Sequence, residues 1–237
     1  MKKINTTITA KSSNLNTEKA INATASSSFE DLYLKKDYKG ALDFLLQNKK
    51  QLNSGIFHYN LGTIYSKTGD FPAARLNLEK AIKEGYINSA SLNNLAYIKS
   101  QLQADDISTS SSLPDQFMNG ALSVPPAAYL SLSLIFLLVG IVLLKTKKLF
   151  KKSSIALFIL LMTAPMIFSE FYLSRINYAV AFKDVVLYEG PSKIFGEKGK
   201  VKAGSKIILG EYKDGWFYVK FPISLAGWIN KDQIVLY

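Results

Sequence analysis

The sequence predicts a multidomain membrane protein that joins all-α helix pairs, a two-helix transmembrane hairpin and a small all-β barrel. Three observations lead to this fold class: an internal repeat with helical periodicity, two uncharged apolar runs around a lysine-rich loop, and alternating short strands near the C-terminus. We divide the chain into a tail (1–28), helical repeats (29–104), a linker (105–123), a first membrane helix (124–144), a basic loop (145–152), a second membrane helix (153–173) and a β domain (174–237).

The tail is rich in Ser, Thr and Asn, a composition typical of disordered segments. It begins with Met1, Lys2 and Lys3 as a signal peptide would, and the residues 23–25 (Ala-Thr-Ala) look like a cleavage site. The apolar run of about 7 to 15 residues that a signal peptide needs is missing between them. Three explanations stay open: a start at another position, export by another route, or an N-terminal domain that stays in the cytoplasm.

The helical region contains one well-formed repeat unit, His58 to Tyr86. Its small residues Gly62 and Ala74 allow two antiparallel helices to approach closely, and Leu61, Tyr65, Leu78 and Ile82 fill the space around them. Leu61, Gly62 and Tyr65, followed by Ala74, Leu78 and Ala81, resemble the tetratricopeptide pattern of about 34 residues. The resemblance predicts stacked helix pairs.

The flanking segments repeat the unit more weakly. Asn60 and Asn94 lie 34 positions apart, and the Lys36-Asp37 pair lies 33 positions before Gly69-Asp70. The count is two repeats and a terminal helix, whereas about three units are needed for independent stability. We therefore expect this domain to lean on a partner or on the membrane.

Stacked helix pairs expose a concave surface that binds peptides or proteins. We place the partner-binding residues of this surface at His58, Tyr59, Asn60 and Asn94. Two alternatives stay open: the two amides bind an extended peptide, or they form caps and inter-helix hydrogen bonds. The lone His58 fits a packing role better than a metal site, because no second histidine is present.

Two uncharged runs, Ala127 to Leu144 and Ser153 to Ser169, predict a transmembrane hairpin. Each is close to the roughly 20 residues that cross a hydrocarbon core of about 30 Å, and the second extends to Leu173. Pro165 is tolerable in a membrane helix. Ser131, Ser133 and Gly140 allow close helix packing, although ordinary variation explains them equally well.

Between the two runs lie five lysines that set the topology: Lys145, Lys147, Lys148, Lys151 and Lys152. Short lysine-rich loops stay in the cytoplasm, where they also face anionic lipid. The loop supplies much of the net charge of +11. Neither end of the chain has a basic stripe with interleaved aromatics, so we expect no nucleic-acid partner.

The C-terminal segment predicts about five short strands closed into a small barrel. Trp216 and Tyr218 share one face of a strand, while Phe217 and Val219 share the other, so one of these faces must be core. The segment resembles a bacterial SH3 domain through Leu187, Glu189-Gly190-Pro191-Ser192, Gly204, Asp214-Gly215-Trp216, Val219, Gly227-Trp228-Ile229 and Ile234. The residues 221–226 (FPISLA) replace the usual short hairpin turn.

The SH3-like resemblance implies a ligand face, because relatives bind proline-rich peptides, cell-wall material or proteins with aromatic grooves. Its residues here are Tyr188, Trp216, Tyr218 and Trp228. Packing within the barrel and contact with a ligand both stay open for these large rings.

The order of the parts resembles the BatE type of the bacterial aerotolerance (Bat) operon family. That resemblance implies a protein of the bacterial inner membrane with its domains in the periplasm, although the tail leaves the side of the N-terminal domain open. It also implies protein partners: membrane proteins with von Willebrand A domains and a MoxR-type ATPase.

Catalysis is not expected. The chain has no cysteine, one histidine, no phosphate-binding glycine loop and no clustered carboxylates at helical spacing, so we expect neither cofactor nor metal. Glu170 with Arg175 beyond it fits a helix end better than an intramembrane acid. The function expected is a membrane-anchored protein–protein interaction adaptor. The alternative is an envelope sensor or cell-wall-binding module whose SH3-like domain binds peptidoglycan.

Overall fold

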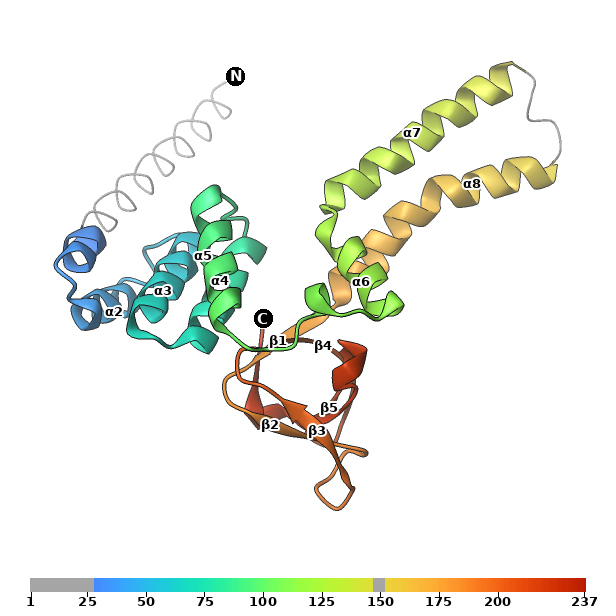
Figure 1. Ribbon diagram of the computed structural model, residues 1–237. Coiled ribbons are helices and arrows are strands. Elements are labelled where there is room, and N and C mark those ends of the chain that lie inside the picture. The colour runs from blue at the N-terminus through green and yellow to red at the C-terminus, as the bar shows by residue number, and fades with distance from the viewer. Residues whose placement is uncertain (1–27, 147–151) are drawn as a thin grey trace, which may run out of the picture.

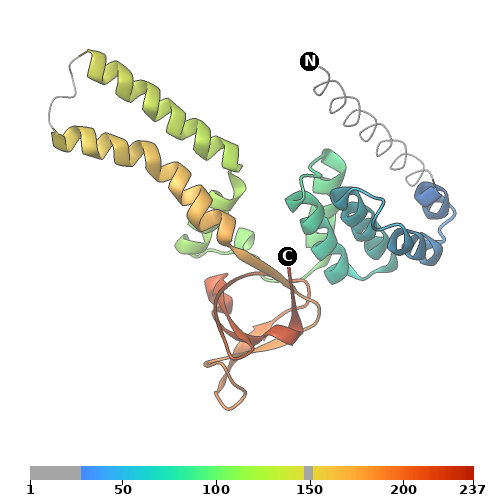
Figure 2. The same ribbon diagram turned by 180° about the vertical axis from the view of Figure 1, so that it is seen from behind.

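The computed structural model describes residues 28–146 and 152–237. A helical region, a hairpin of two long helices and a small β domain follow one another along the chain (Figure 1). The view from behind shows the helical region and the hairpin rising from the same side of the β domain (Figure 2). The tail residues 1–27 and the loop residues 147–151 lie outside the described residues.

The helical region consists of helical residues 28–34 followed by α2 (Tyr38–Gln47), α3 (Ser54–Thr68), α4 (Phe71–Lys83) and α5 (Ser89–Gln101). The helices begin at side-chain caps, since Asp37, Asn53, Asp70 and Asn88 each accept a hydrogen bond from a first-turn N–H. The pairs Lys36-Asp37 and Gly69-Asp70 have the same geometry, with a positive φ at the first residue (62° and 83°) and an N-cap at the second.

The close approach predicted at Gly62 is present. A Cβ built on Gly62 would lie 2.7 Å from Cγ of Leu78, closer than any real side chain tolerates. Two apolar clusters fill the helical region, one between residues 28–34, α2 and α3, and the other between α3, α4 and α5. Leu61, Tyr65 and Leu78, which were expected around Gly62 and Ala74, are in these clusters, whereas Ile82 is in neither.

The predicted linker, residues 105–123, carries regular structure. It contains the 3₁₀ turn η1 (Ile107–Thr109) and the helix α6 (Leu113–Ser123). Ile107 and Met118 are buried against Ile208 and Phe221 of the β domain. The segment therefore packs as part of the β domain's outer surface rather than connecting two bodies freely.

The hairpin consists of α7 (Pro126–Lys145) and α8 (Lys152–Ile167). The helix of α8 continues through the π-helical turn η2 (Phe168–Tyr172) and the 3₁₀ turn η3 (Leu173–Arg175). Both helices, Pro126–Lys145 and Lys152–Arg175, are long and apolar enough to cross a membrane. The first begins two residues later than predicted, because proline favours the first helical position and Pro125 keeps an extended backbone.

The β domain is one antiparallel sheet of seven strands, where the sequence predicted five. The strands are β1 (Asn177–Ala181), β2 (Val185–Tyr188), β3 (Glu197–Val201), β4 (Lys206–Lys213), β5 (Trp216–Phe221), β6 (Gly227–Asn230) and β7 (Ile234–Leu236), in the order β3-β2-β6-β5-β4-β1-β7. The 3₁₀ turns η4 (Ile223–Leu225) and η5 (Lys231–Gln233) lie between the last strands. Short strands such as β7 are recognisable only by their partner, here β1.

The sheet curls around one apolar core (Figure 1). Every strand contributes to it, with Ala179, Val185, Leu187, Val201, Ile207, Leu209, Val219, Ile229 and Ile234 among its buried residues. Phe217 packs against this core and Val219 is inside it, so Trp216 and Tyr218 lie on the opposite face of β5, outside this core.

Candidate functional site

Helix α4 joins the helical region to the β domain through a buried arginine. Arg75 is 1% exposed, its Nη1 donates a 2.9 Å hydrogen bond to the carbonyl oxygen of Gly204, and its Nη2 is paired with the Asp106 carboxylate. The residues from Ala73 to Leu78 are all buried, because α4 is covered by helices on one side and by the β domain on the other. The helical region thus leans on the β domain of its own chain.

A chain of charges extends this contact. Glu79 lies between Arg75, whose Nε is 3.8 Å from its Oε1, and Lys206, whose Nζ is 2.6 Å from its Oε2. Lys99 lies 3.4 Å from the Asp106 carboxylate. Burial alone would raise the pKa of Asp106, but the Arg75 guanidinium, the Ser108 backbone N–H and Lys99 together hold that pKa well below its usual range.

Two tyrosine rings of the β domain, Tyr178 and Tyr237, lie beside the lysines of this contact. The Lys206 ammonium lies 4.7 Å from the ring centre of Tyr178 and 5.7 Å from that of Tyr237, and the Lys83 ammonium lies 5.9 and 5.6 Å from the same two rings. Burial, with a smaller contribution from the Glu79 carboxylate, raises the pKa of Tyr178 to about 12. Burial also raises the pKa of Tyr237. Both phenols therefore stay neutral at physiological pH.

Gly204 allows the two parts to approach. Its φ of 81° lies in the left-handed region, and a Cβ on it would lie 2.5 Å from Cδ2 of Leu102. A side chain here would separate the end of α5 from the turn before β4. Beside this contact lies a polar cavity of about 170 Å³, whose lining includes Glu79, Asp106, Ser108 and Tyr178.

The predicted partner-binding residues of the helical region have different environments. Asn60 is buried, so it does not lie on an open concave surface. Asn94 donates a 3.5 Å hydrogen bond to the Tyr59 hydroxyl, which is the inter-helix role that the sequence left open. The Tyr59 ring lies 5.0 Å from that of Tyr86, and burial raises the Tyr59 pKa.

His58 faces away from this group. Its Nδ1 lies 2.9 Å from Oδ1 of Asn77 on α4. It borders a groove of about 370 Å³ that is also lined by Lys80, Lys83, Glu84 and Tyr237. The four predicted residues therefore do not form one surface, because successive helix positions point in different directions.

The four aromatic residues predicted to form a ligand face lie close together on the β domain. Tyr188 on β2 is paired with Trp228 on β6, and Trp228 with Tyr218 on β5. The ring centres of Tyr188 and Trp216 are 5.5 Å apart, and those of Tyr218 and Trp228 are 5.6 Å apart. Trp216 is buried, while the other three are half-buried and offer their rings to solvent.

The loop that follows Tyr188 also exposes apolar side chains. Ile194 is 95% exposed and Phe195 is 49% exposed, in the turn between β2 and β3. Phe195 packs over Gly190, where a Cβ would lie 2.5 Å from the ring. Ile194 and Phe195 thus add exposed apolar area to the β domain.

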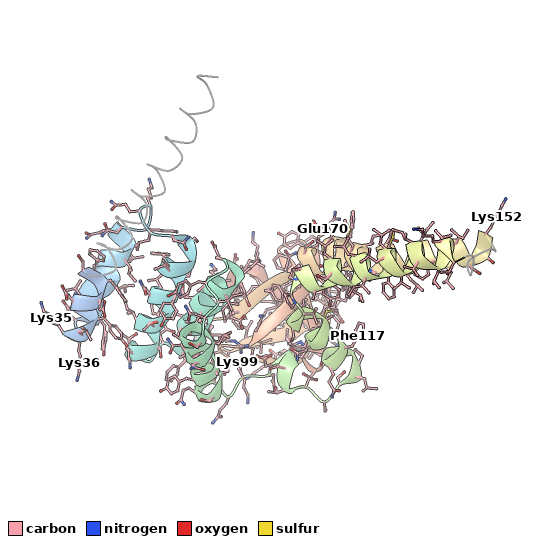
Figure 3. The ribbon with its side chains drawn as sticks, turned by 90° about the horizontal axis from the view of Figure 1, so that it is seen from above. Lys35, Lys36, Lys99, Phe117, Lys152 and Glu170 are labelled. Carbon is pink, nitrogen blue, oxygen red and sulfur yellow. The ribbon has the colours of Figure 1, made fainter. Side chains whose placement is uncertain are left out.

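Two of the five topology lysines are described. Lys145 ends α7 and Lys152 begins α8, and Figure 3 shows Lys152 at the tip of the hairpin, at the opposite end from Glu170. Lys147, Lys148 and Lys151 lie outside the described residues. Glu170 and Arg175 stand at the base of the hairpin, where Arg175 lies 5.2 Å from the Phe171 ring centre.

The sequence interpretation missed Arg75, Glu79 and Asp106. No local pattern indicates this contact, because Arg75, Asp106 and Lys206 are brought together from distant parts of the chain. In the part of the chain that the structure describes, no group of three His, Asp or Glu side chains is placed to hold a metal ion. Comparison with protein-family models, curated proteins and solved structures gives no match.

Proposed function

We propose that this protein is a membrane-anchored protein–protein interaction adaptor. The observation that carries the proposal is the buried Arg75 contact, which locks the helical region to the β domain at the base of an apolar hairpin. Two adjoining binding modules in a fixed relation lose little orientational freedom when a partner engages both of them. In this proposal the helical region and the β domain are the two surfaces that bind other proteins.

The topology proposed follows from the hairpin. Both ends of the α7–α8 pair meet the same body, because α6 precedes α7 and β1 follows α8. We place the helical region and the β domain together on the periplasmic side of a bacterial inner membrane, with the lysine-rich tip in the cytoplasm. Under this proposal the N-terminal helical region lies in the periplasm, so we do not adopt the alternative of an N-terminal domain that stays in the cytoplasm.

We take the fold families and the partners from the resemblance to tetratricopeptide repeats, bacterial SH3 domains and the BatE type of protein. The helix pairs are assigned to the tetratricopeptide type and the curled sheet to the SH3-like type. The protein then belongs beside von Willebrand A domain proteins of the Bat type and a MoxR-type ATPase, in a complex that serves aerotolerance or stress resistance.

Co-purification tests this function. The full chain is extracted from its native membrane in mild detergent, and the proteins retained are identified by mass spectrometry. We expect Bat-type neighbours with the unchanged chain and a loss of at least one of them with Tyr188→Ala/Trp228→Ala. The matched control is Tyr212→Ala, which removes an aromatic side chain that is 53% exposed and is paired with Phe217, on the opposite face of β5 from Tyr218. Equal recovery of the Bat-type proteins with the unchanged chain and with both variants would exclude the aromatic face as a protein-binding surface.

A second candidate function is supported by the aromatic face itself. Flat rings with polar groups at their edges also suit cell-wall material, so the β domain is a candidate peptidoglycan-binding module of an envelope sensor. Sedimentation of the detergent-solubilised chain with purified cell wall distinguishes the two. Binding that is lost with Tyr188→Ala/Trp228→Ala and kept with Tyr212→Ala would favour the sensor.

A further inference from the structure

Helix α6 exposes an apolar stripe that the proposed function does not use. Leu113 is 78% exposed, Phe117 is 70% exposed and Val124, just after the helix, is 39% exposed. Spacings of four and seven residues place these three side chains on one side of the helix. Gly120 lies within the same stripe and has nothing within 4 Å of an added Cβ.

The opposite side of α6 is firmly attached to the β domain. Met118 is 4% exposed and packs with Ile208 and Phe221, and Leu122 packs against the same cluster. Asp115 is fully buried, and its carboxylate accepts hydrogen bonds from the Ile223 N–H at 3.0 and 3.2 Å. The helix therefore cannot turn to bury its apolar stripe against its own domain.

The exposed part of α6 carries no charge. Its single ionisable side chain is Asp115, which is buried, and its other residues are apolar, amide or hydroxyl. A helix that faces water usually carries charged residues on its outer side. An uncharged outer side with an exposed Leu and Phe is instead typical of a helix that meets lipid.

The position of α6 in the chain also indicates lipid. Only Val124 and Pro125 separate it from α7, and the Tyr129 hydroxyl donates a 2.8 Å hydrogen bond to the carbonyl oxygen of Ala121. Figure 3 shows Phe117 at the base of the hairpin, at the same end as Glu170 and far from Lys152.

That base has the features of a membrane boundary. Phe171 and Tyr172 are exposed there, Arg175 lies over the Phe171 ring, and the Lys220 ammonium lies 5.5 Å from the Tyr172 ring centre. Aromatic rings beside cationic side chains are typical anchors at the headgroup level.

We propose that α6 is an interfacial membrane helix, with Leu113, Phe117 and Val124 inserted between the lipids around the hairpin. The inference rests on the proposed anchoring of α7 and α8 in the membrane. Because Asp115 and Met118 attach α6 to the β domain, the inserted stripe fixes the depth and tilt of that domain on the bilayer. The aromatic face is thereby held in one orientation toward its partner.

Single-cysteine spin labelling tests this helix, since the chain contains no native cysteine. Labels are placed at Leu113→Cys and Phe117→Cys in the full chain, reconstituted in vesicles of phosphatidylethanolamine and phosphatidylglycerol. Leu138→Cys in the middle of α7 serves as the membrane reference. Leu34→Cys, on a side chain that is 69% exposed in the helical region, serves as the aqueous reference. The measurement is the accessibility of each label to oxygen and to a water-soluble nickel chelate.

We expect the labels at positions 113 and 117 to have an oxygen-to-nickel accessibility ratio several-fold above that at position 34 and below that at position 138. The corresponding depth is about 5 to 10 Å. Ratios at 113 and 117 equal to that at 34, with 138 still protected from nickel, would overturn the interfacial helix and leave the anchor standing. Nickel access at 138 would overturn both. Labels at 113 and 117 shielded from both reagents would assign the stripe to a protein partner or a second copy, which also overturns the proposal.

Discussion

Helices α4 and α7 differ in which side chains they bury: α4 buries polar side chains, whereas α7 exposes apolar ones. Helix α4 buries an arginine and an asparagine, Arg75 and Asn77, inside the protein. Helix α7 buries Ser133 and Gly140 and exposes ten of its leucine, isoleucine and valine side chains: Leu130, Leu132, Leu134, Ile135, Leu137, Leu138, Val139, Ile141, Val142 and Leu144.

Under the proposed membrane anchoring, the difference matches each helix to its own surroundings. A buried charge is tolerable when it is paired and hydrogen-bonded, as Arg75 is by Asp106 and Gly204. An apolar side chain is tolerable outside when the solvent is hydrocarbon. The predictions below test these two conditions, from the largest expected effect to the smallest.

Removing the buried cation should have the largest effect. Arg75→Met leaves the Asp106 carboxylate buried without its main counter-charge, so we expect a loss of about 3 to 5 kcal/mol in the free energy of unfolding. Denaturant unfolding in mild detergent measures it through Trp216 and Trp228, the chain's two tryptophans, both in the β domain.

Two further chains control this measurement. The double variant Arg75→Met/Asp106→Leu removes both charges and should lose less than Arg75→Met alone. Lys35→Met changes an exposed lysine and should stay within about 0.5 kcal/mol of the unchanged chain. An Arg75→Met chain as stable as Lys35→Met would show that the buried pair does not hold the two parts together.

Placing a cation on α7 should have the next largest effect. Leu138→Arg puts a charge near the middle of the proposed span, at a cost of about 2.5 to 3.5 kcal/mol for insertion. Leu34→Arg changes a similarly exposed leucine of the helical region (69% against 63%) and should have no such effect. The fraction of protein that resists alkaline extraction from membranes measures the difference, and equal fractions would mean that α7 does not face lipid.

Overpacking between α3 and α4 should have a smaller effect. Gly62→Leu forces a side chain into Leu78, so we expect a loss of about 1 to 3 kcal/mol. Thermal unfolding followed by far-ultraviolet circular dichroism measures it. Gly120→Ala adds a methyl group where nothing lies within 4 Å and should not destabilise the protein. Unchanged unfolding of Gly62→Leu would contradict the close approach of the two helices.

Lowering the pH should reduce the free energy of unfolding by less than Arg75→Met does, through protonation of Asp106. Because the pKa of Asp106 is lower in the folded protein than its ordinary value of 3.8, the pair stabilises the fold above that value and loses this contribution as the pH falls below it. Asp106→Asn lacks this titration. The difference in free energy of unfolding between the unchanged chain and Asp106→Asn should therefore narrow below pH 3.8. A difference that stays constant as the pH falls further would contradict a stabilising pair of Arg75 with ionised Asp106.

The packing of α3 against α4 and the two long apolar helices could be predicted because their signals are local. The contact of Gly62 with Leu78 follows from residues sixteen positions apart on two consecutive helices, and the ends of α7 lie within two residues of the predicted span. The shared face of Trp216 and Tyr218 could be predicted from the alternation of a strand alone, and the structure shows that the opposite face packs on the core. The strand count was less accurate, because β7 exists only through its pairing with β1.

The sequence by itself determined the order of the parts, the length and uncharged character of the two long helices, and the alternation that brings Tyr188, Tyr218 and Trp228 to one face. Each of these depends on the spacing of neighbouring residues and on the solvent they meet. Only the tertiary structure decided that Arg75 reaches Gly204, 129 positions away, and that α6 docks on the β domain through Asp115. Long-range pairing of charges and backbone groups leaves no period in the sequence, because it depends on where two separately folded parts come to rest against each other.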